Sequence, residues 1–347
     1  MKKAKDRARG LSTSDELFQI IFAFQKPRVV LTAFELGLFT VLGDKSRTSS
    51  EAARALRTAP RATDRLMNAL CAIGLLAKKN GQFSNSPLAA RHLVKGKPDY
   101  LAGLGHGVNL WDSWSTLTEA VRRGASVVAK RVSERGKESL TSFIAAMHTR
   151  AVRMAAGVVA LLDLSHVTRV LDVGAGSGAY CMAFVRANER IRATAFDLPH
   201  VIPLTKKYIK QEQLSDKIQT VAGDCNADSL GKGFDLIFLS ALIHSNSFEE
   251  NRELIRKAAD ALNPGGQVVI QDFIVSEDRT EPAFAALFAL NMLVGTKAGD
   301  TYTESEVRSW MRKAGLSKIV RIGTAYDTTL IIGRKAHQDK APFHQVQ

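Results

Sequence analysis

The chain has 347 residues, 45% of them hydrophobic and 24% charged, which is enough apolar material for two globular cores, so we expect two domains. The longest apolar stretch, residues 19–42, is interrupted by Lys26, Arg28 and Glu35, and the charged N-terminus is not followed by an apolar signal-peptide segment. We therefore expect a cytoplasmic protein without a membrane span.

All of the formal net charge of +14 lies in the first 160 residues, which hold 26 Lys and Arg against 12 Asp and Glu, whereas the remainder holds 22 of each. This asymmetry indicates a domain division and raises the question of an acidic partner, nucleic acid or a membrane surface, for the N-terminal half. Three scattered cysteines, Cys71, Cys181 and Cys225, have neither the even count of a disulfide framework nor the spacing of a zinc site. We expect reduced structural thiols and no metal.

Helical spacing of apolar residues dominates the first hundred residues. Ser49 or Ser50 can cap a short helix, and Pro60 opens a second one. The apolar stripe of that second helix contains Leu66, Leu70, Ile73 and Leu75. Asn80-Gly81, between two short alternating segments, predicts a β-hairpin. The order helix, helix, hairpin is typical of a winged-helix domain.

From residue 166 onward, short β-branched runs alternate with helical segments, which is typical of a parallel, doubly wound sheet in an α/β domain. The runs cover residues 168–173, 193–197, 218–222, 234–240, 267–273, 318–323 and 328–334. The last two are joined by Tyr326-Asp327, which is too short for a helical crossover, so we expect the sheet to end antiparallel.

These patterns divide the chain into four parts. We assign residues 12–100 to the winged-helix domain and residues 101–165 to a helical linker that contributes to the substrate pocket. Residues 166–336 form the α/β domain, and residues 337–347 are expected to be a disordered tail.

A glycine-rich turn follows the first strand of the α/β domain, in the sequence Asp172-Val173-Gly174-Ala175-Gly176-Ser177-Gly178. Glycines at this place let the backbone turn sharply and approach a ligand. Asp197, at the end of the second strand, can accept hydrogen bonds from both ribose hydroxyls of a nucleoside. Because Gly174, Gly176 and Ala179 also fit the Rossmann pattern, this turn alone does not separate NAD from S-adenosylmethionine (SAM).

Two further motifs narrow the choice between NAD and SAM. Gly223-Asp224 follows the third strand, and Asn263-Pro264-Gly265-Gly266 precedes the fifth. With the antiparallel end of the sheet and the winged-helix front, the chain resembles, over residues 17–334, the two-domain SAM-dependent small-molecule O-methyltransferases. This family includes plant caffeate-type and acetylserotonin-type enzymes and bacterial natural-product methyltransferases. The resemblance implies a Rossmann-like class I methyltransferase domain behind a winged-helix domain that forms a homodimer.

The resemblance also implies how SAM is held. The glycine turn takes the methionine part, Asp197 the ribose, and Asp224 lies beside the adenine. Where the family has Gly-Asp-x-Phe, this chain has Gly223-Asp224-Cys225-Asn226, so we expect Cys225 to contact the ring instead. The complete predicted set is Gly174, Ala175, Gly176, Gly178, Asp197, Leu198, Asp224, Cys225 and Ser240.

Methyl transfer to a hydroxyl calls for a base near the nucleophile. His244 follows the fourth strand at the ligand-binding edge of the sheet, where the resembling enzymes place their catalytic histidine. Asp272 matches one of the two acids that orient this histidine in the plant enzymes, whereas Thr301 stands in place of the other. Ser245-Asn246 also replaces the usual Asp-Trp. If the acceptor is already acidic, proximity alone suffices, which leaves C- or N-methylation open.

The substrate pocket is expected between the domains. Asn291 is the best specificity candidate because a buried amide needs a partner. Phe284, Phe288 and Met292 recur at helical spacing, which fits plain helix core equally well. The predicted lining is Trp111, Phe143, Met147, Phe288, Asn291 and Met292.

Two other functions remain open from the sequence. Arg57, Arg61 and Arg65 around the second helix, with the basic N-terminal half, fit a winged-helix DNA-binding regulator that senses SAM. An NAD-dependent oxidoreductase is the second, although the last third of the chain supplies no visible nicotinamide chemistry. Our prediction is a homodimeric SAM-dependent enzyme that methylates a small aromatic or polycyclic metabolite and does not bind nucleic acid.

Overall fold

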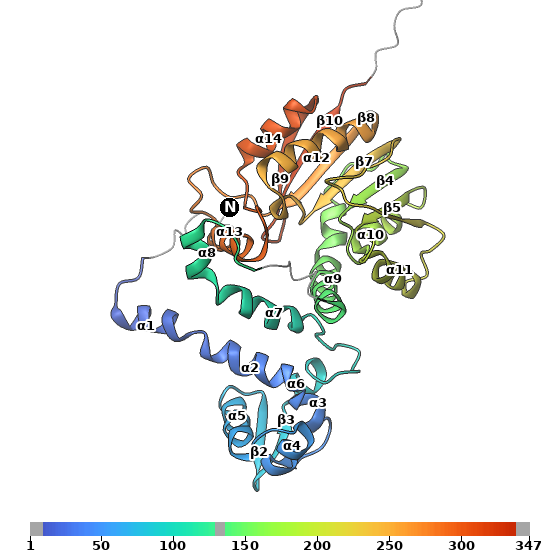
Figure 1. The fold of residues 1–347 in the computed structure, drawn as a ribbon. Coiled ribbons are helices and arrows are strands. Elements are labelled where there is room, and N and C mark those ends of the chain that lie inside the picture. Colours follow the sequence, from blue (N-terminus) through green and yellow to red (C-terminus); the bar gives the residue numbers. More distant parts are fainter. Residues whose placement is uncertain (1–9, 129–135, 338–347) are drawn as a thin grey trace, which may run out of the picture. The chain divides into compact units, whose positions relative to one another are not determined.

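The computed structural model describes residues 10–128 and 136–337 (Figure 1). The predicted tail at residues 337–347 lies outside the described residues except for its first residue. The chain divides into two compact units, Met1–Val108 and Asn109–Gln347.

The N-terminal unit is mostly helical, with one small sheet in which β1 and β2 both pair antiparallel with β3. Its core is made of buried side chains from α3, α5 and β3, among them Phe39, Met67 and Phe83. In chain order the elements are α1 (Ser14–Phe22), α2 (Gln25–Glu35), α3 (Leu38–Leu42), β1 (Arg47–Thr48), α4 (Ser49–Leu56), α5 (Pro60–Ala72), β2 (Leu76–Lys79), β3 (Gln82–Asn85) and α6 (Pro87–His92), and α7 (Leu104–Trp114) crosses into the second unit.

The predicted cap of α4 is wrong by one residue. Thr48 is the N-cap: its hydroxyl accepts a hydrogen bond from the backbone N–H of Glu51, and the Glu51 carboxylate accepts one from the N–H of Thr48. This reciprocal capping box outweighs either serine, because it satisfies two free N–H groups at once. Ser49 is the first residue of the helix.

The predicted stripe of α5 needs a similar correction. The helix begins at Pro60 as expected but ends at Ala72, so Ile73 and Leu75 lie beyond it. Its buried face consists of Thr63, Met67 and Leu70, and Leu66 is only partly buried. The hairpin forms as predicted, with positive φ at both Asn80 (50°) and Gly81 (74°).

The second unit contains a seven-stranded sheet in the order β6-β5-β4-β7-β8-β10-β9. The strands are β4 (Arg169–Val173), β5 (Arg192–Asp197), β6 (Ile218–Ala222), β7 (Phe234–Ser240), β8 (Leu262–Asp272), β9 (Leu316–Gly323) and β10 (Thr329–Lys335). The first five pair in parallel, and β10 runs antiparallel to both β8 and β9. The expected parallel sheet with an antiparallel last strand is confirmed.

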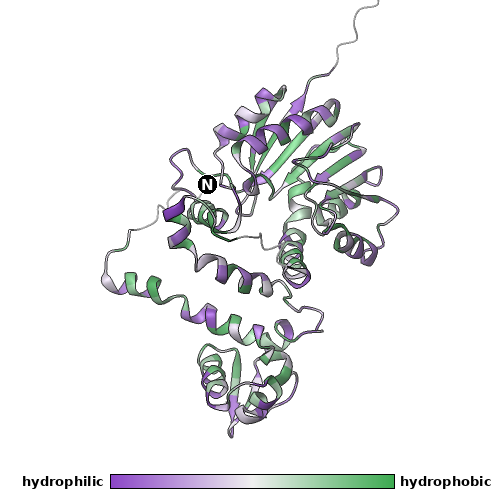
Figure 2. Ribbon diagram, viewed as in Figure 1, coloured by the Kyte–Doolittle hydropathy of each residue, from purple (hydrophilic) through white to green (hydrophobic). Residues whose placement is uncertain are grey.

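Helices cover both faces of this sheet (Figure 1), whose strands are mostly apolar (Figure 2). One core lies under α12 and α14, and the other lies under α9 and α10. The helices of the unit are α8 (Leu117–Arg123), α9 (Lys137–Val159), α10 (Ala179–Ala187), α11 (Ile202–Gln211), α12 (Phe248–Ala261), α13 (Ala283–Gly295) and α14 (Glu304–Lys313), with a short 3₁₀ turn at Ile243–Ser245. Crossovers leave β4 in one direction and β7 in the other, so the carboxyl ends of these two strands flank the crevice in which such sheets bind ligands.

The first helix of the chain exposes its apolar side chains. No residue of α1 is buried, and Leu17, Phe18, Ile20, Ile21 and Phe22 are each about half exposed or more. In the described part of the chain, the helical stretch Ser14–Glu35 alone is long and apolar enough to cross a membrane by length and composition. A buried core helix or a signal sequence passes the same test, so this finding is weak support for a span.

Candidate functional site

The glycine turn between β4 and α10 has a backbone that requires glycine. Gly174, Gly176 and Gly178 have φ values of 72°, 56° and 77°, which side-chain-bearing residues rarely adopt. At Gly174 space is also short, because an added Cβ would lie 3.1 Å from Cδ1 of Leu242. The turn therefore presents its backbone, rather than side chains, at the end of β4.

Asp197 ends β5 beside this turn. One carboxylate oxygen accepts a hydrogen bond from the N–H of Gly176 at 2.7 Å, and the other accepts one from the N–H of Leu198 at 2.7 Å. Burial raises the pKa of Asp197, and the two backbone hydrogen bonds act in the opposite direction. Each oxygen keeps a further lone pair, so the carboxylate can still accept two ribose hydroxyls. These residues fit a nucleoside.

The loop after β6 carries two further predicted cofactor residues, Asp224 and Cys225. The exposed Asp224 accepts a hydrogen bond from the N–H of Asn226 at 2.9 Å, which folds its side chain onto its own loop. Cys225 packs against the same core cluster as Leu242, and burial raises the pKa of its thiol to about 12, so it stays protonated. Ser240, at the end of β7, donates to the side chain of Gln271 on β8 at 3.0 Å.

Sequence reasoning missed a contact from α9 to the glycine turn. Nδ1 of His148 lies 2.9 Å from the hydroxyl of Ser177, and the imidazole stacks on Tyr208 of α11 at 4.2 Å. Burial lowers the pKa of His148. The sequence carries no signal for this contact, because it joins two elements through their packing.

His244 lies in the 3₁₀ turn after β7, and Asp272 is the last residue of the neighbouring strand β8. Nδ1 of His244 is 2.8 Å from Oδ1 of Asp272, and the two side chains are 10% and 1% exposed. The same Asp272 oxygen accepts a hydrogen bond from the N–H of Phe273 at 2.8 Å. The predicted histidine and acid are therefore brought together, because parallel neighbouring strands end at the same edge of the sheet.

A buried amide network holds the turn at the place where the family has Asp-Trp. The hydroxyl of Tyr302 donates to the carbonyl of Asn246 at 2.6 Å, and the side-chain amide of Asn246 donates to Asn251 at 3.3 Å. Asn251 in turn donates to the carbonyl of Ile243, next to His244, at 2.8 Å. The turn is fixed by these contacts instead of by the family's aspartate and tryptophan.

The second acid of the plant enzymes has no replacement among the described contacts of His244. Thr301 is buried, its N–H donates to Asp300 and its carbonyl accepts from Arg279. The chain approaches the histidine turn at Gly299 instead, where an added Cβ would overlap the carbonyl oxygen of His244.

An aromatic cluster lies beside the imidazole. The ring of Phe288 meets His244 edge-on at 4.9 Å, and Phe273 lies 4.6 Å from Phe288 and 5.9 Å from His244. Phe284 completes the cluster, 4.9 Å from Phe273, and remains 41% exposed. Of the three residues at helical spacing, Met292 is buried, and Phe288 is partly buried against the cluster of Phe273, Val275 and Ala285, whereas Phe284 is exposed.

The other predicted substrate residues lie on α7, α9 and α13. Asn291 accepts a hydrogen bond from the indole N–H of Trp114 at 2.9 Å. The partner expected for this amide is therefore Trp114, whereas the sequence prediction named Trp111 as the tryptophan of the pocket. Phe143 packs against the buried cluster of Leu140, Ile144 and Val201. The partly buried Trp111 and Met147 lie on α7 and α9.

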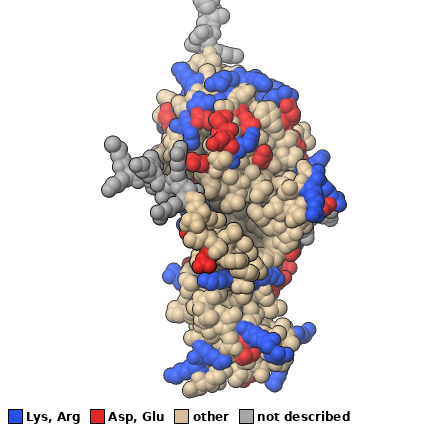
Figure 3. Space-filling model, turned by 90° about the vertical axis from the view of Figure 1, so that its left-hand side faces the viewer, with Lys and Arg blue, Asp and Glu red and all other residues tan. Residues whose placement is uncertain are grey.

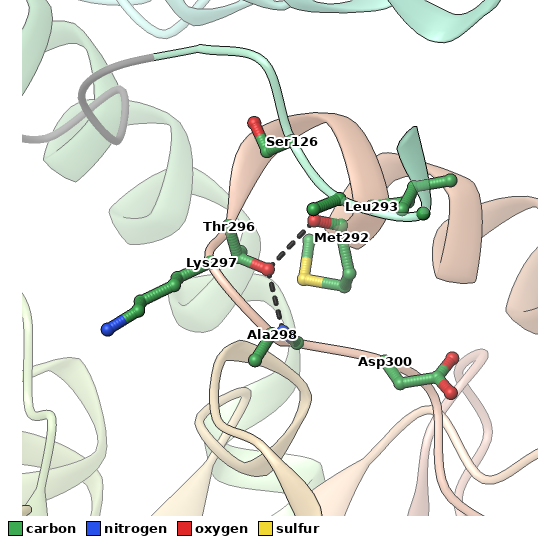
Figure 4. A pocket seen from close by; sticks show the side chains of 10 residues that line it. Ser126, Met292, Leu293, Thr296, Lys297, Ala298 and Asp300 are labelled. Atoms are coloured by element: carbon green, nitrogen blue, oxygen red, sulfur yellow. Dashed lines mark hydrogen bonds between the residues drawn. The ribbon is translucent and has the colours of Figure 1, made fainter. Parts of the chain in front are cut away.

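A small pocket with a volume of about 180 Å³ lies between the end of α13 and residues 124–126 (Figure 4). Met292 is the one predicted substrate residue that lines it. The hydroxyl of Thr296 donates to the carbonyl of Met292 and accepts from the N–H of Gly299, both at 2.8 Å. The pocket therefore adjoins the segment that supports the His244 turn.

Comparison with known proteins agrees with this geometry. Residues 114–317 match the model of the O-methyltransferase domain, and residues 18–95 match that of the O-methyltransferase dimerisation domain. The chain is 34% identical to a 3-hydroxy-5-methyl-1-naphthoate 3-O-methyltransferase of Streptomyces sahachiroi, over 90% of this chain and 92% of the relative. It is 29% identical to the acetylserotonin O-methyltransferase of Gallus gallus, over 95% and 100%.

A solved structure gives the same result. PigF with S-adenosylhomocysteine (SAH) matches 93% of this chain and 100% of its own with a TM-score of 0.85 and 26% identity. The NAD-dependent reading is thereby set aside in favour of SAM. These similarities show that the chain belongs to the O-methyltransferase family and is a SAM-dependent methyltransferase.

Proposed function

We propose that this enzyme transfers the methyl group of SAM to a hydroxyl of a small aromatic or polycyclic metabolite, with His244 as the general base. The observation that carries the proposal is the contact of 2.8 Å between His244 and Asp272 beside the aromatic cluster. A carboxylate at Nδ1 favours the tautomer with its proton there, which leaves Nε2 free to take the acceptor's proton. When bound, SAM supplies an electrophilic methyl group on a sulfonium.

The cofactor would be held by the residues at the ends of β4, β5, β6 and β7. In this proposal the backbone of the glycine turn takes the methionine part, Asp197 binds the ribose, and Leu198 with the Asp224 loop borders the adenine. Cys225 offers an apolar surface rather than a reactive thiol, because its pKa is raised. Asp272 acts on the acceptor only through His244 and is a positioning residue.

Names of relatives support an aromatic acceptor. Besides the naphthoate enzyme, a tetracenomycin polyketide synthesis 8-O-methyltransferase of Streptomyces glaucescens is 30% identical over 92% of this chain. A second candidate, C-methylation, is favoured by one observation: a single acid orients His244. An L-tyrosine C(3)-methyltransferase of Streptomyces lavendulae is 27% identical over 86% of this chain.

We further propose that the N-terminal unit has a winged-helix arrangement and forms a homodimer in the cytoplasm. The match to the dimerisation domain and the exposed apolar side of α1 support this proposal. The DNA-binding alternative is less favoured, because residues 18–95 match a dimerisation domain, although Figure 3 shows more Lys and Arg than acidic side chains in its lower part. The domain limits 12–100, 101–165 and 166–336 remain part of the proposal.

The cofactor part of the proposal is tested by calorimetry with SAH and NAD. We expect saturable SAH binding, a loss of at least tenfold in affinity for Asp197→Ala because two hydrogen bonds to the ribose disappear, and no binding of NAD. The matched control is Asp216→Ala, which changes an exposed carboxylate between α11 and β6, away from the proposed cofactor residues. Absence of SAH binding to the unaltered enzyme would sink the proposal.

The catalytic part is tested with a panel of phenols and enols. His244→Ala should lower kcat about a hundredfold or more with an unchanged Kd for SAH, because the base is lost and the cofactor residues are untouched. Products are identified by mass spectrometry and NMR. A methyl group on carbon, made equally fast by His244→Ala, would favour the C-methylation alternative.

A further inference from the structure

Among the described residues near the site, Arg150 is a cation that has no role in the proposed mechanism. It lies on α9, three residues after Met147 and seven after Phe143, so the three side chains share one flank of the helix. Its guanidinium carbon is 4.6 Å from the ring centre of Phe273 and 5.9 Å from that of Phe284. The guanidinium therefore borders the same aromatic cluster as His244, with the Phe273 ring in contact with both.

Within residues 10–128 and 136–337, this guanidinium makes no ion pair and no hydrogen bond. Asp327, Tyr180 and Asp272 act on it through space, and Asp272 is already bonded to His244 and Phe273. Burial lowers the pKa of Arg150, although a guanidinium keeps its charge in proteins. A partly buried charge without a hydrogen-bonded partner is costly, so it points to an anion that arrives with a ligand.

The position of Arg150 on α9 favours the acceptor over the cofactor as the source of that anion. His148, which contacts the glycine turn through Ser177, is two residues away and so points about 200° around the helix. The buried face of α9, which includes Ile144, Met154 and Val158, lies between these two flanks. Arg150 thus faces the phenylalanines, not the turn that presents its backbone to the cofactor.

We propose that Arg150 binds a carboxylate on the methyl acceptor, so that the substrates are hydroxyaryl carboxylic acids. The inference rests on the proposed function, because it takes the cluster beside His244 as the acceptor site. An aromatic ring against Phe288, which contacts His244, and the exposed Phe284, which lies near Arg150, would direct its hydroxyl to His244 and its carboxylate to Arg150. Arg150 forms up to two parallel hydrogen bonds with a carboxylate, which fixes the ring in one orientation and so determines which hydroxyl is methylated.

The test is a binding comparison that needs no turnover. The enzyme is saturated with SAH and titrated with a hydroxynaphthoic acid whose substituents are on opposite rings, and then with its primary amide. We expect the unaltered enzyme to prefer the acid about tenfold or more, Arg150→Gln to lose this preference, and Arg150→Lys to keep part of it. Arg153→Gln is the matched control, because this exposed arginine lies on the same helix and should leave the preference intact.

Three results would overturn the proposal. The first is equal binding of acid and amide by the unaltered enzyme. The second is weaker SAH binding by Arg150→Gln with an unchanged acid-to-amide ratio, which would assign the cation to the cofactor's carboxylate. The third is a lower melting temperature with both probes weakened equally, which would make Arg150 a packing residue. Failure of the unaltered enzyme to bind SAH would instead be a failure of the proposed function.

Discussion

Asp172, the first residue of the glycine-rich motif, is a fully buried carboxyl whose charge costs free energy. Burial raises its pKa to about 7, and the charge of Asp197 adds to the effect, while the Cys181 thiol, 3.5 Å from Oδ2, opposes it. A pKa above the unfolded value of 3.8 means that the folded state holds this proton more tightly. The group therefore lowers stability as the pH rises from about 4 to about 7.

Asp172→Asn should remove this loss of stability at higher pH, because the amide does not titrate. We expect the free energy of unfolding of the variant, relative to the unaltered enzyme, to rise by up to about 4 kcal/mol between pH 4 and pH 7.5. Urea unfolding at several pH values measures the difference. The control is Asp224→Asn at an exposed carboxylate, and a flat difference for Asp172→Asn would contradict the prediction.

At the scale of elements, the turn that carries His244 depends on the segment after α13. Gly299 packs so closely against the His244 carbonyl that a Cβ there would overlap it, and the same Cβ would lie 2.7 Å from the Thr296 hydroxyl. Backbone atoms cannot give way as the end of a flexible side chain can. Gly299 therefore fixes the backbone of His244, and through it the imidazole, by close packing and without a hydrogen bond to the ring.

Gly299→Ala should displace the turn and lower kcat about tenfold or more, while the Kd for SAH stays within twofold. Steady-state kinetics with any acceptor found in the screen, together with calorimetry, measure both quantities. Gly295→Ala is the control, because a Cβ at that position in α13 meets nothing within 4 Å. Equal kinetics of the two variants would show that the turn does not need this support.

The elements differ in how far the sequence predicts them. The strands and the glycine turn follow from local patterns, and the His244–Asp272 pair follows from strands that end at one edge. The capping box of Thr48 and Glu51 was present in the sequence as a Thr-x-x-Glu motif, but the adjacent serines masked it. The contact of Trp114 with Asn291 joins residues 177 apart, and only packing places them together.

At the scale of the whole molecule, α1 exposes apolar side chains that the described part of the chain leaves uncovered. Phe18, Ile21 and Phe22 are each about half exposed, which is costly in water unless another surface covers them. The match of residues 18–95 to a dimerisation domain identifies a second copy of the chain as the occupant in our proposal.

Phe18→Asp with Ile21→Asp should weaken the dimer at least tenfold, because two charges would replace apolar contacts. Light scattering after size-exclusion chromatography measures the oligomeric state, and SAH binding reports whether the second unit is intact. Gln19→Asp is the control, since it adds a charge at an exposed polar position of the same helix. A monomeric unaltered enzyme, or a dimer unaffected by the double substitution, would contradict the prediction.

The contact between Gly174 and Leu242 has a consequence for protein engineering. Leu242 fills the space next to Gly174, where an added Cβ would lie 3.1 Å from its Cδ1, and it precedes His244 by two residues. If the glycine turn binds the cofactor and His244 is the base, as we propose, enlarging the turn for a bulkier sulfonium analogue would displace Leu242 and with it His244. Cofactor scope and regioselectivity in this enzyme should therefore be redesigned jointly, with Leu242 among the first positions to vary.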